Sequence, residues 1–258
     1  MIDIHSHILY GLDDGAETIE DTMAMLRLAS NSSTKEIIFT PHIAEEFNYS
    51  IDTAVERFKI ARERARLEGI DIKIHLGFEV RLDKEIFASH EFDINRLTVN
   101  NEGKYLLLEF PFLDIPAYYK EIIKYLTSAD ITPIIVHPLR NSRIIQNPSI
   151  VKELFSQGCL LQFNADDTRD PRLAGILMRL LKQNLVHFIA SDAHSIDLRP
   201  PILSNAYRFI ESRAGKKTAE MLFTVNPGKV VKGEIIDDED LQKQGIFDRI
   251  KDIFNKQV

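Results

Sequence analysis

The sequence alternates between short β-prone runs and longer amphipathic helical stretches, and this order constrains the fold more than any other feature. The candidate strands are residues 1–8, 36–40, 72–80, 105–110, 132–136, 160–164 and 186–190. Helical spacing of apolar residues occupies 19–29, 53–68, 117–129, 149–157, 172–183 and 202–212. A strand-then-helix order implies parallel strands joined by right-handed crossovers. Seven such strands predict an α/β fold built as a closed or nearly closed barrel.

The chain is long enough for one large domain, because α/β barrels routinely occupy roughly 200 to 250 residues as a single unit. We expect this barrel to span residues 1–227 of the 258. Residues 228–258 differ in composition, with an acidic stretch at 234–240 followed by apolar residues at helical spacing in 245–254. This part is predicted to be an acidic linker and a short amphipathic C-terminal helix that packs on protein.

Overall charge and cysteine content exclude several classes of protein. The 32 basic and 39 acidic residues give a net charge of -7, which argues against a general nucleic-acid binder. The single cysteine rules out a disulfide framework and fits a reducing compartment. No secretory signal opens the sequence, and no run approaches the roughly 20 apolar residues of a membrane span. We therefore expect a cytoplasmic protein, either a monomer or a homo-oligomer.

Histidines and carboxylates stand where the candidate strands end, which is where an α/β barrel keeps its catalytic groups. The first strand contains Asp3-Ile4-His5-Ser6-His7, and Ser191-Asp192-Ala193-His194 follows the last one. Strand alternation predicts that His5 and His7 share the face toward the barrel interior, opposite Ile2 and Ile4. Two hydrogen-bonded core histidines would explain one such motif equally well. A second pair at another strand end favours metal ligation, which satisfies buried polar groups.

Further motifs make a resemblance specific. They are Asp13-Asp14-Gly15, Thr40-Pro41-His42, Gly77-Phe78-Glu79, Leu108-Glu109-Phe110 and His137-Pro138-Leu139-Arg140. Together with the two strand-end motifs, they resemble the polymerase-and-histidinol-phosphatase (PHP) superfamily, and within it the bacterial capsule and exopolysaccharide tyrosine phosphatases. The resemblance implies a distorted (β/α)7 barrel similar to a TIM barrel and a trinuclear metal centre. It also implies a phosphotyrosine-bearing protein as substrate, namely a bacterial tyrosine kinase that controls capsule or exopolysaccharide synthesis.

The resemblance assigns three divalent metal ions to nine residues. The first ion would be held by His5, His7, Glu79 and Asp192, the second by Glu79, Glu109 and His137, and the third by Asp14, His42 and His194. Manganese is expected, with iron or zinc as alternatives, because mixed imidazole and carboxylate donors suit these ions better than magnesium or calcium. A metal-bound hydroxide would attack phosphorus. Arg140 and Arg199 match phosphate-orienting arginines, although a surface salt bridge is the alternative for each.

Three departures from relatives bear on substrate preference. Ile43 and Leu139 stand where relatives commonly carry His and Glu, and Asp166-Asp167 replaces small hydroxyl-bearing residues at the expected rim.

Cys159 is followed six positions later by Ala165, not by the arginine of thiol-based tyrosine phosphatases. Two other hypotheses stay open: a small-molecule phosphomonoesterase of the histidinol-phosphate type, and a non-catalytic kinase-binding regulator. We expect His75, His90 and His187 to lie outside the metal centre.

Overall fold

Nine parallel strands form the centre of the molecule in a computed structural model that describes residues 1–88 and 93–236. They are β1 (Ile2–Asp3), β2 (Glu36–Phe39), β3 (His42–Ile43), β4 (Lys73–Leu76), β5 (Glu79–Arg81), β6 (Tyr105–Glu109), β7 (Thr132–Val136), β8 (Leu160–Asn164) and β9 (Phe188–Ala190). Within these residues they make two sheets, with the strand orders β1-β2-β4 and β3-β5-β6-β7-β8-β9.

Two short breaks explain why nine strands occupy seven positions. The chain passes from β2 to β3 through Pro41, which has no N–H to donate to a neighbouring strand. It passes from β4 to β5 through Gly77 and Phe78, so the single run predicted at 72–80 is two strands. Across the breaks, Gly77 N still donates to Phe39 O (2.9 Å) and Glu79 N to Pro41 O (3.2 Å). The strands β3 and β5 therefore continue β2 and β4.

The ring closes where the first strand meets the last. Ser6 and Ala193 form an isolated parallel bridge. Asp192 N donates to His5 O (2.9 Å), and His7 N donates to Ala193 O (2.8 Å). The predicted distorted (β/α)7 barrel is confirmed.

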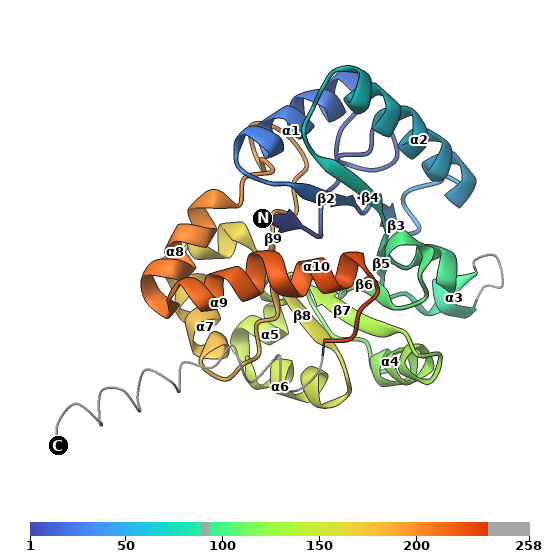
Figure 1. The fold of residues 1–258 in the computed structure, drawn as a ribbon. Helices are drawn as coiled ribbons and strands as arrows, with labels where there is room; N and C mark the ends of the chain where they lie inside the picture. Colours follow the sequence, from blue (N-terminus) through green and yellow to red (C-terminus); the bar gives the residue numbers. More distant parts are fainter. Residues whose placement is uncertain (89–92, 237–258) are drawn as a thin grey trace.

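Helices surround the ring of strands (Figure 1). The longer ones are α1 (Ile19–Asn31), α2 (Ile51–Leu67), α4 (Tyr119–Ser128), α6 (Ser149–Ser156), α7 (Pro171–Leu181) and α8 (Ser204–Ala214). Shorter ones are α3 (Lys84–Ala88), α5 (Ser142–Gln146), α9 (Lys216–Glu220) and α10 (Asn226–Val231), and single turns cover Ile94–Leu97, Val99–Asn101, Pro138–Arg140, Ala165–Thr168 and Met221–Val225. In the described residues, no helix is long and apolar enough to cross a membrane.

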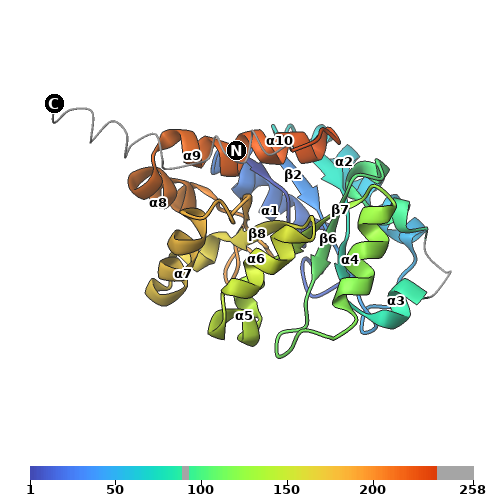
Figure 2. The same cartoon turned by 90° about the horizontal axis from the view of Figure 1, so that it is seen from below.

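The C-terminal helices cover the end of the barrel where the strands begin. Figure 2 shows α9 and α10 lying across this end beside the N-terminus. Asn226 Nδ2 donates to His187 O (3.0 Å) just before β9, and Val230 is buried in the same apolar cluster as Ile2. The domain boundary predicted at residue 227 falls inside α10. The amphipathic segment predicted at 245–254 and His90 lie outside the described residues.

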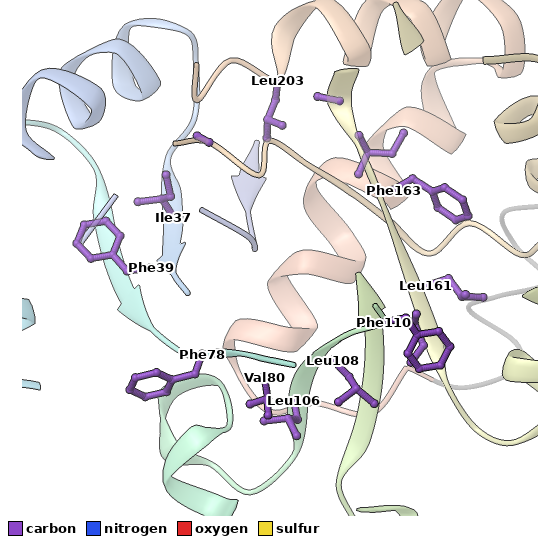
Figure 3. Close-up of a cluster of buried hydrophobic side chains, with 14 of the residues drawn as sticks. Ile37, Phe39, Phe78, Val80, Leu106, Leu108, Phe110, Leu161, Phe163 and Leu203 are labelled. Carbon is purple, nitrogen blue, oxygen red and sulfur yellow. The ribbon is translucent and has the colours of Figure 1, made fainter. Parts of the chain in front are cut away.

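Two apolar clusters pack on opposite sides of the strands. The outer cluster lies between strands and helices and includes Phe39, Phe78, Leu108 and Phe163 (Figure 3). The inner cluster takes the alternate strand residues, and its members are Ile2, Ile4, Ile38, Val99, Tyr105, Leu107, Ile134, Val136, Leu160, Phe188, Ala190 and Val230. The expectation that Ile2 and Ile4 lie on the face opposite the barrel interior was wrong, because β1 ends at Asp3 and the alternation does not continue to His7.

Candidate metal centre

All nine residues proposed as metal ligands lie together at the carboxyl end of the barrel. They form overlapping groups whose donor atoms lie within 4.8 Å of one another: His7, Asp14, His42 and His194; His5, Glu79 and His137; His5, His7 and Asp192; and His42, Glu79 and Glu109. Eight of them lie at or just after the end of a strand, or at the breaks between β2 and β3 and between β4 and β5, and Asp14 lies in the loop between β1 and α1. Because parallel strands end on the same side of a barrel, the fold brings these side chains into one site.

Glu79 is the centre of this cluster. It is completely buried, and its two oxygens contact four imidazoles. Oε2 lies 3.1 Å from His5 Nε2, 3.0 Å from His7 Nε2 and 3.1 Å from His42 Nδ1, and Oε1 lies 2.7 Å from His137 Nε2. A carboxylate with both oxygens among separate donor groups has the placement expected of a bridging ligand.

Asp192 connects the cluster to the arginines. Its Oδ1 lies 3.6 Å from His5 Nε2 and 3.6 Å from His7 Nε2. Its Oδ2 accepts from Asn164 Nδ2 (2.8 Å) and Arg199 Nη1 (3.1 Å), and lies 2.8 Å from Arg140 Nη2. One oxygen therefore faces the histidines while the other is held by three side chains.

Asp14 and His194 form the outer part of the cluster. His194 Nε2 lies 3.3 Å from Asp14 Oδ1, and His42 Nε2 lies 3.7 Å from the same oxygen. The Asp14 side chain is 54% exposed, whereas the His42 and His194 side chains are buried. This group is open to solvent, in contrast to the group around Glu79.

Backbone strain occurs at two of the proposed ligands. His137 has a φ of 32° and Asp192 a φ of 52°, both in the left-handed region that residues other than glycine rarely adopt. Such strain costs about 1–3 kcal/mol per residue and is typical of functional sites. Each strained residue directly follows or nearly follows a barrel strand, where the turn of the backbone directs its side chain into the cluster.

The residues fit divalent metal ions. Among the described residues, His42 Nδ1, Glu109 Oε1 and Asp192 Oδ1 are buried atoms without a hydrogen-bond partner. Buried polar atoms nearly always have a partner, so three such atoms in one cluster require an explanation. Coordination would satisfy them, and mixed imidazole and carboxylate donors suit manganese, iron or zinc.

The charges of the cluster support the same conclusion. Burial alone would lower the pKa of His7, but the carboxylates of Asp13 and Glu79 raise it well above its usual value. Burial alone would raise the pKa of Glu79, but the surrounding histidines hold it well below its usual value. Burial and the charge of Glu79 raise the pKa of Glu109. Metal ions would replace the protons on these histidines and relieve the repulsion between the two glutamates.

Three positioning residues were not predicted as part of the site. His7 Nδ1 donates to Asp13 Oδ2 (2.7 Å), and His5 Nδ1 donates to Gln162 Oε1 (2.8 Å). Gln162 Nε2 donates to Asn164 Oδ1 (3.0 Å), which orients the amide, and Asn164 in turn holds Asp192. Such contacts fix the free ring nitrogen of a metal-binding histidine toward the ion. The polar Gln162 within the apolar run of β8 is the sequence signal that could have revealed this role.

A cavity of about 480 Å³ opens over the cluster. Its lining residues are Asp14, His42, Glu46, Phe47, Arg81, Glu109, Phe112, Arg140, His194 and Arg199. Both predicted arginines therefore border the cavity, and Arg81 joins them, with its Nε donating to Glu109 Oε2 (2.9 Å). A larger cavity of about 1030 Å³ lies beside α2 and contains none of the nine proposed ligands, so size alone does not identify the site.

Of the residues that depart from relatives, most are buried and only one is exposed. Ile43 and Leu139 are buried in the outer apolar cluster. Asp167 is also buried, its Oδ2 accepts from Asn164 N (2.9 Å), and burial raises its pKa to about 7. Only Asp166 is exposed, and it pairs with Arg169 (3.0 Å). Apolar replacements in the core do not obstruct the cavity, so none of the three changes the proposed ligand set.

Cys159 is buried as expected, away from the cavity lining. Burial raises the pKa of its thiol to about 12, which keeps it protonated near neutral pH. A thiolate nucleophile at this position is therefore excluded.

Comparison with known proteins decides the family. The model for the capsular polysaccharide synthesis family CpsB/CapC matches residues 1–232. The chain belongs to the CpsB/CapC family. This match extends over the whole barrel and includes every residue of the cluster.

Relatives in the CpsB/CapC family share about a third of their residues with this chain. Tyrosine-protein phosphatase YwqE of Bacillus subtilis is 33% identical over 241 residues, 92% of this chain and 93% of that protein. Tyrosine-protein phosphatase CpsB of Streptococcus pneumoniae is 30% identical over 248 residues, 92% of this chain and 100% of that protein.

Solved structures agree with the family assignment. One solved structure belongs to a set that covers B. subtilis YwqE and S. pneumoniae CpsB, described as metal-dependent tyrosine phosphatases. It matches this chain with a TM-score of 0.84 and 30% identity, over 92% of this chain and 96% of that one. Histidinol phosphate phosphatase of Lactococcus lactis, solved with zinc, L-histidinol and phosphate, matches with a TM-score of 0.50 and 17% identity, covering 86% and 94%. The second match supports the fold alone.

Proposed function

We propose that this CpsB/CapC family member is a metal-dependent protein-tyrosine phosphatase that hydrolyses phosphotyrosine. The observation that supports this best is the cluster of nine imidazole and carboxylate side chains under a cavity that Arg140 and Arg199 border. The relatives named tyrosine-protein phosphatases point to the same activity. A buried thiol at Cys159 leaves metal chemistry as the route.

The nine proposed ligands would hold the metal ions, and two further residues orient the histidines among them. Three divalent ions, manganese first and iron or zinc as alternatives, would be held by the nine residues, and Glu79 belongs to two of the ligand groups. When bound, such ions activate water and polarise the phosphoryl group. Asp13 and Gln162 orient His7 and His5 through their Nδ1 atoms, so that Nε2 of each ring faces the cluster.

Arg140 and Arg199 bind and orient the phosphoryl group in this proposal. Both border the cavity and both contact Asp192 Oδ2, which fixes their positions beside the cluster. A guanidinium has several planar donors, so each can hold Asp192 and still donate to a phosphoryl oxygen. The phenol released from phosphotyrosine has a pKa of about 10 and needs less protonation than an alkyl alcohol. The absence of an obvious general acid in the described cavity lining is compatible with that leaving group.

We also propose a protein substrate, a bacterial tyrosine kinase that controls capsule or exopolysaccharide synthesis. Membership of a capsular polysaccharide synthesis family supports this partner. The cytoplasmic location and the homo-oligomer considered from the sequence stay predictions.

The test is phosphate release from a phosphotyrosine peptide, a phosphoserine peptide and histidinol phosphate. Chelator-treated protein is assayed with and without added manganese. We expect manganese-dependent release from the phosphotyrosine peptide, lost in His194→Ala and retained in the matched variant His75→Ala, since His75 pairs with Glu36 outside the cleft. Preference for histidinol phosphate would instead support the small-molecule phosphatase. No turnover with manganese, iron or zinc would support the non-catalytic regulator.

A further inference from the structure

Two phenylalanines form walls of the cavity above the cluster. Phe47 lies in the loop between β3 and α2, and Phe112 lies in the loop after β6. The Phe47 ring is nearly parallel to the His42 ring, with an interplanar angle of 8° and centroids 5.4 Å apart. Phe112 is 48% exposed. The cavity therefore has polar groups at the cluster and aromatic surface nearer the solvent.

Further exposed apolar side chains are sequence neighbours of residues that line the cavity, in the loop of Phe112 and in the loop between His194 and Arg199. Leu113 is 81% exposed, and in the loop after β9 Ile196 is 48% and Leu198 85% exposed. These four residues, Phe112, Leu113, Ile196 and Leu198, are called the apolar rim. The other exposed large apolar side chains among the described residues are Ile60, Leu67, Tyr125, Val225 and Ile235, which are on other elements. Exposed apolar side chains on loops that border a polar cavity are available to contact a ligand that extends out of it.

The loops of the apolar rim are held in place by hydrogen bonds. Ser142 N donates to Phe112 O (2.8 Å), and Asn141 Nδ2 donates to the carbonyls of Pro111 (2.6 Å) and Asp114 (3.0 Å). In the second loop, His194 N donates to Arg199 O (3.0 Å) and Leu198 N to Ser195 Oγ (3.0 Å). Anchored loops present their side chains without a large ordering cost on binding.

We propose that Phe47 and Phe112 hold the phenyl ring of phosphotyrosine, and that the rest of the apolar rim contacts apolar side chains flanking it in an extended peptide. This inference rests on the proposed function and specifies its substrate. An aryl phosphate places its phosphoryl group at the cluster and its ring between the aromatic walls. A phosphoserine side chain has no ring, so binding it leaves the aromatic walls without a partner.

Binding to a non-hydrolysable peptide tests this proposal without depending on turnover. The probe is a fluorescent peptide with phosphonomethylphenylalanine in place of phosphotyrosine, flanked by leucines or, in a second version, by serines. Anisotropy titrations use the manganese-loaded full chain. Phe112→Ala should weaken binding of both peptides by roughly 5- to 10-fold, the usual size of an aromatic pair contribution. Phe112→Tyr should restore it.

Leu198→Ser separates the rim from the aromatic walls. It should weaken binding of the leucine-flanked peptide by roughly threefold or more, the loss of one partly buried apolar contact, and leave the serine-flanked peptide unchanged. The matched variants Tyr125→Ala and Leu67→Ser remove exposed apolar side chains on α4 and α2 and should change neither affinity. Unchanged affinity in Phe112→Ala, or equal affinity of wild type for a phosphonate analogue of phosphoserine, would overturn the inference.

Turnover distinguishes this inference from the proposed function. With the matching phosphotyrosine peptide, Phe112→Ala should raise KM by a similar factor and leave kcat nearly unchanged, because Phe112 touches the ring and not the reacting atoms. A wild-type protein that binds the phosphonate peptide but hydrolyses no phosphopeptide would contradict the proposed function and retain the inference. If wild type hydrolyses the phosphotyrosine peptide and Phe112→Ala has the same KM, the proposed function is retained and the inference about the aromatic walls is overturned.

Discussion

The five histidines of the cluster and His187 are all buried, but the groups around them differ. Each of the cleft histidines His5, His7, His42, His137 and His194 has a carboxylate oxygen within 4.0 Å. His187 has no such ion pair among the described residues; its Nδ1 accepts from Leu161 N (2.9 Å), and its ring stacks on Phe155 with centroids 5.2 Å apart. Burial is common to both regions, so the carboxylates are what distinguish a candidate metal site from an ordinary core histidine.

The pKa values express the same difference. Burial lowers the pKa of His187 to about 3, with no charged group opposing it. Burial also acts on His5, but Glu79 and Asp192 hold its pKa above the usual value. Burial thus favours the neutral form of His187, whereas the carboxylates around His5 favour a positive charge at this ring, which a metal ion would supply in place of a proton.

Removal of a proposed ligand should give the largest effect. His7→Ala removes one donor from a group of buried donors and should abolish manganese binding at that group. Losing the metal should remove several kcal/mol of transition-state stabilisation. The rate of phosphotyrosine hydrolysis should therefore fall by more than about a thousandfold. His187→Ala is the matched variant, because it removes a buried histidine without a carboxylate neighbour. Manganese content after dialysis checks both variants, and equal content in the two would break the comparison.

Positioning residues should give the next largest effect. Asp13→Asn weakens the acceptor that holds His7 Nδ1, and Gln162→Leu removes the acceptor that holds His5 Nδ1. Each change should weaken manganese affinity by about 10- to 100-fold. Calorimetric titration with manganese measures this, with the exposed Asp166→Asn as control. Affinity within twofold of wild type would show that the metal does not depend on these contacts.

The ring and the gathering of the candidate residues at one end of it could be predicted from the sequence, because both follow from strand ends, whereas the role of these residues as metal ligands came from the family resemblance and stays a prediction. Eight of the nine proposed ligands lie in or shortly after a β-prone run, with Asp14 in the loop that follows the first run, and parallel strands end on one side of a barrel. The sequence did not predict the break at Gly77 and Phe78, because the apolar pattern of residues 72–80 continues through it. Nor did it predict the burial of Ile43 and Leu139, since proximity to a ligand in sequence does not define the direction of a side chain.

The contacts among polar side chains were the least predictable part. Gln162 and Asn164 reach the cluster because β8 lies next to β9, a pairing that strand order alone leaves open until the ring is closed. Arg81 borders the cavity and also pairs with Glu109 across β5 and β6, a contact that the sequence did not predict. Such contacts depend on register, which the sequence of a single chain does not specify.

His187 should make stability depend on pH in a defined direction. Its pKa is about 6.5 in an unfolded chain and about 3 in the fold, so unfolding takes up a proton below about pH 6.5. The stability it contributes is full above that pH and is lost as the pH falls toward 3. Between pH 7 and pH 5 the loss is about 2 kcal/mol. Urea unfolding of metal-free protein at both pH values measures it.

The matched variant for this measurement is His187→Gln, whose side chain does not titrate. Between pH 7 and pH 5, the free energy of unfolding should fall by about 2 kcal/mol less in the variant than in wild type. An identical loss in both proteins would mean that His187 is not the group responsible.

Cys159→Ala should have the smallest effect on activity. The thiol is buried among apolar groups before β8, and burial keeps it protonated. We expect phosphotyrosine turnover within about twofold of wild type and a stability loss of about 1 kcal/mol from the smaller side chain. Turnover and thermal unfolding check the two parts separately. A large loss of turnover with unchanged thermal unfolding would contradict a purely structural thiol.

The ring can close only after both its first and its last strand have been synthesised. Ser191 N donates to Asp3 Oδ1 across 188 positions of sequence. At roughly 5–20 residues per second, a ribosome needs roughly 10 to 40 s to add that length. During most of this interval His5 and His7 have been made while Asp192 has not. Translation therefore determines when a complete set of ligands first exists, and a chain cut short before the last strand has only part of the set.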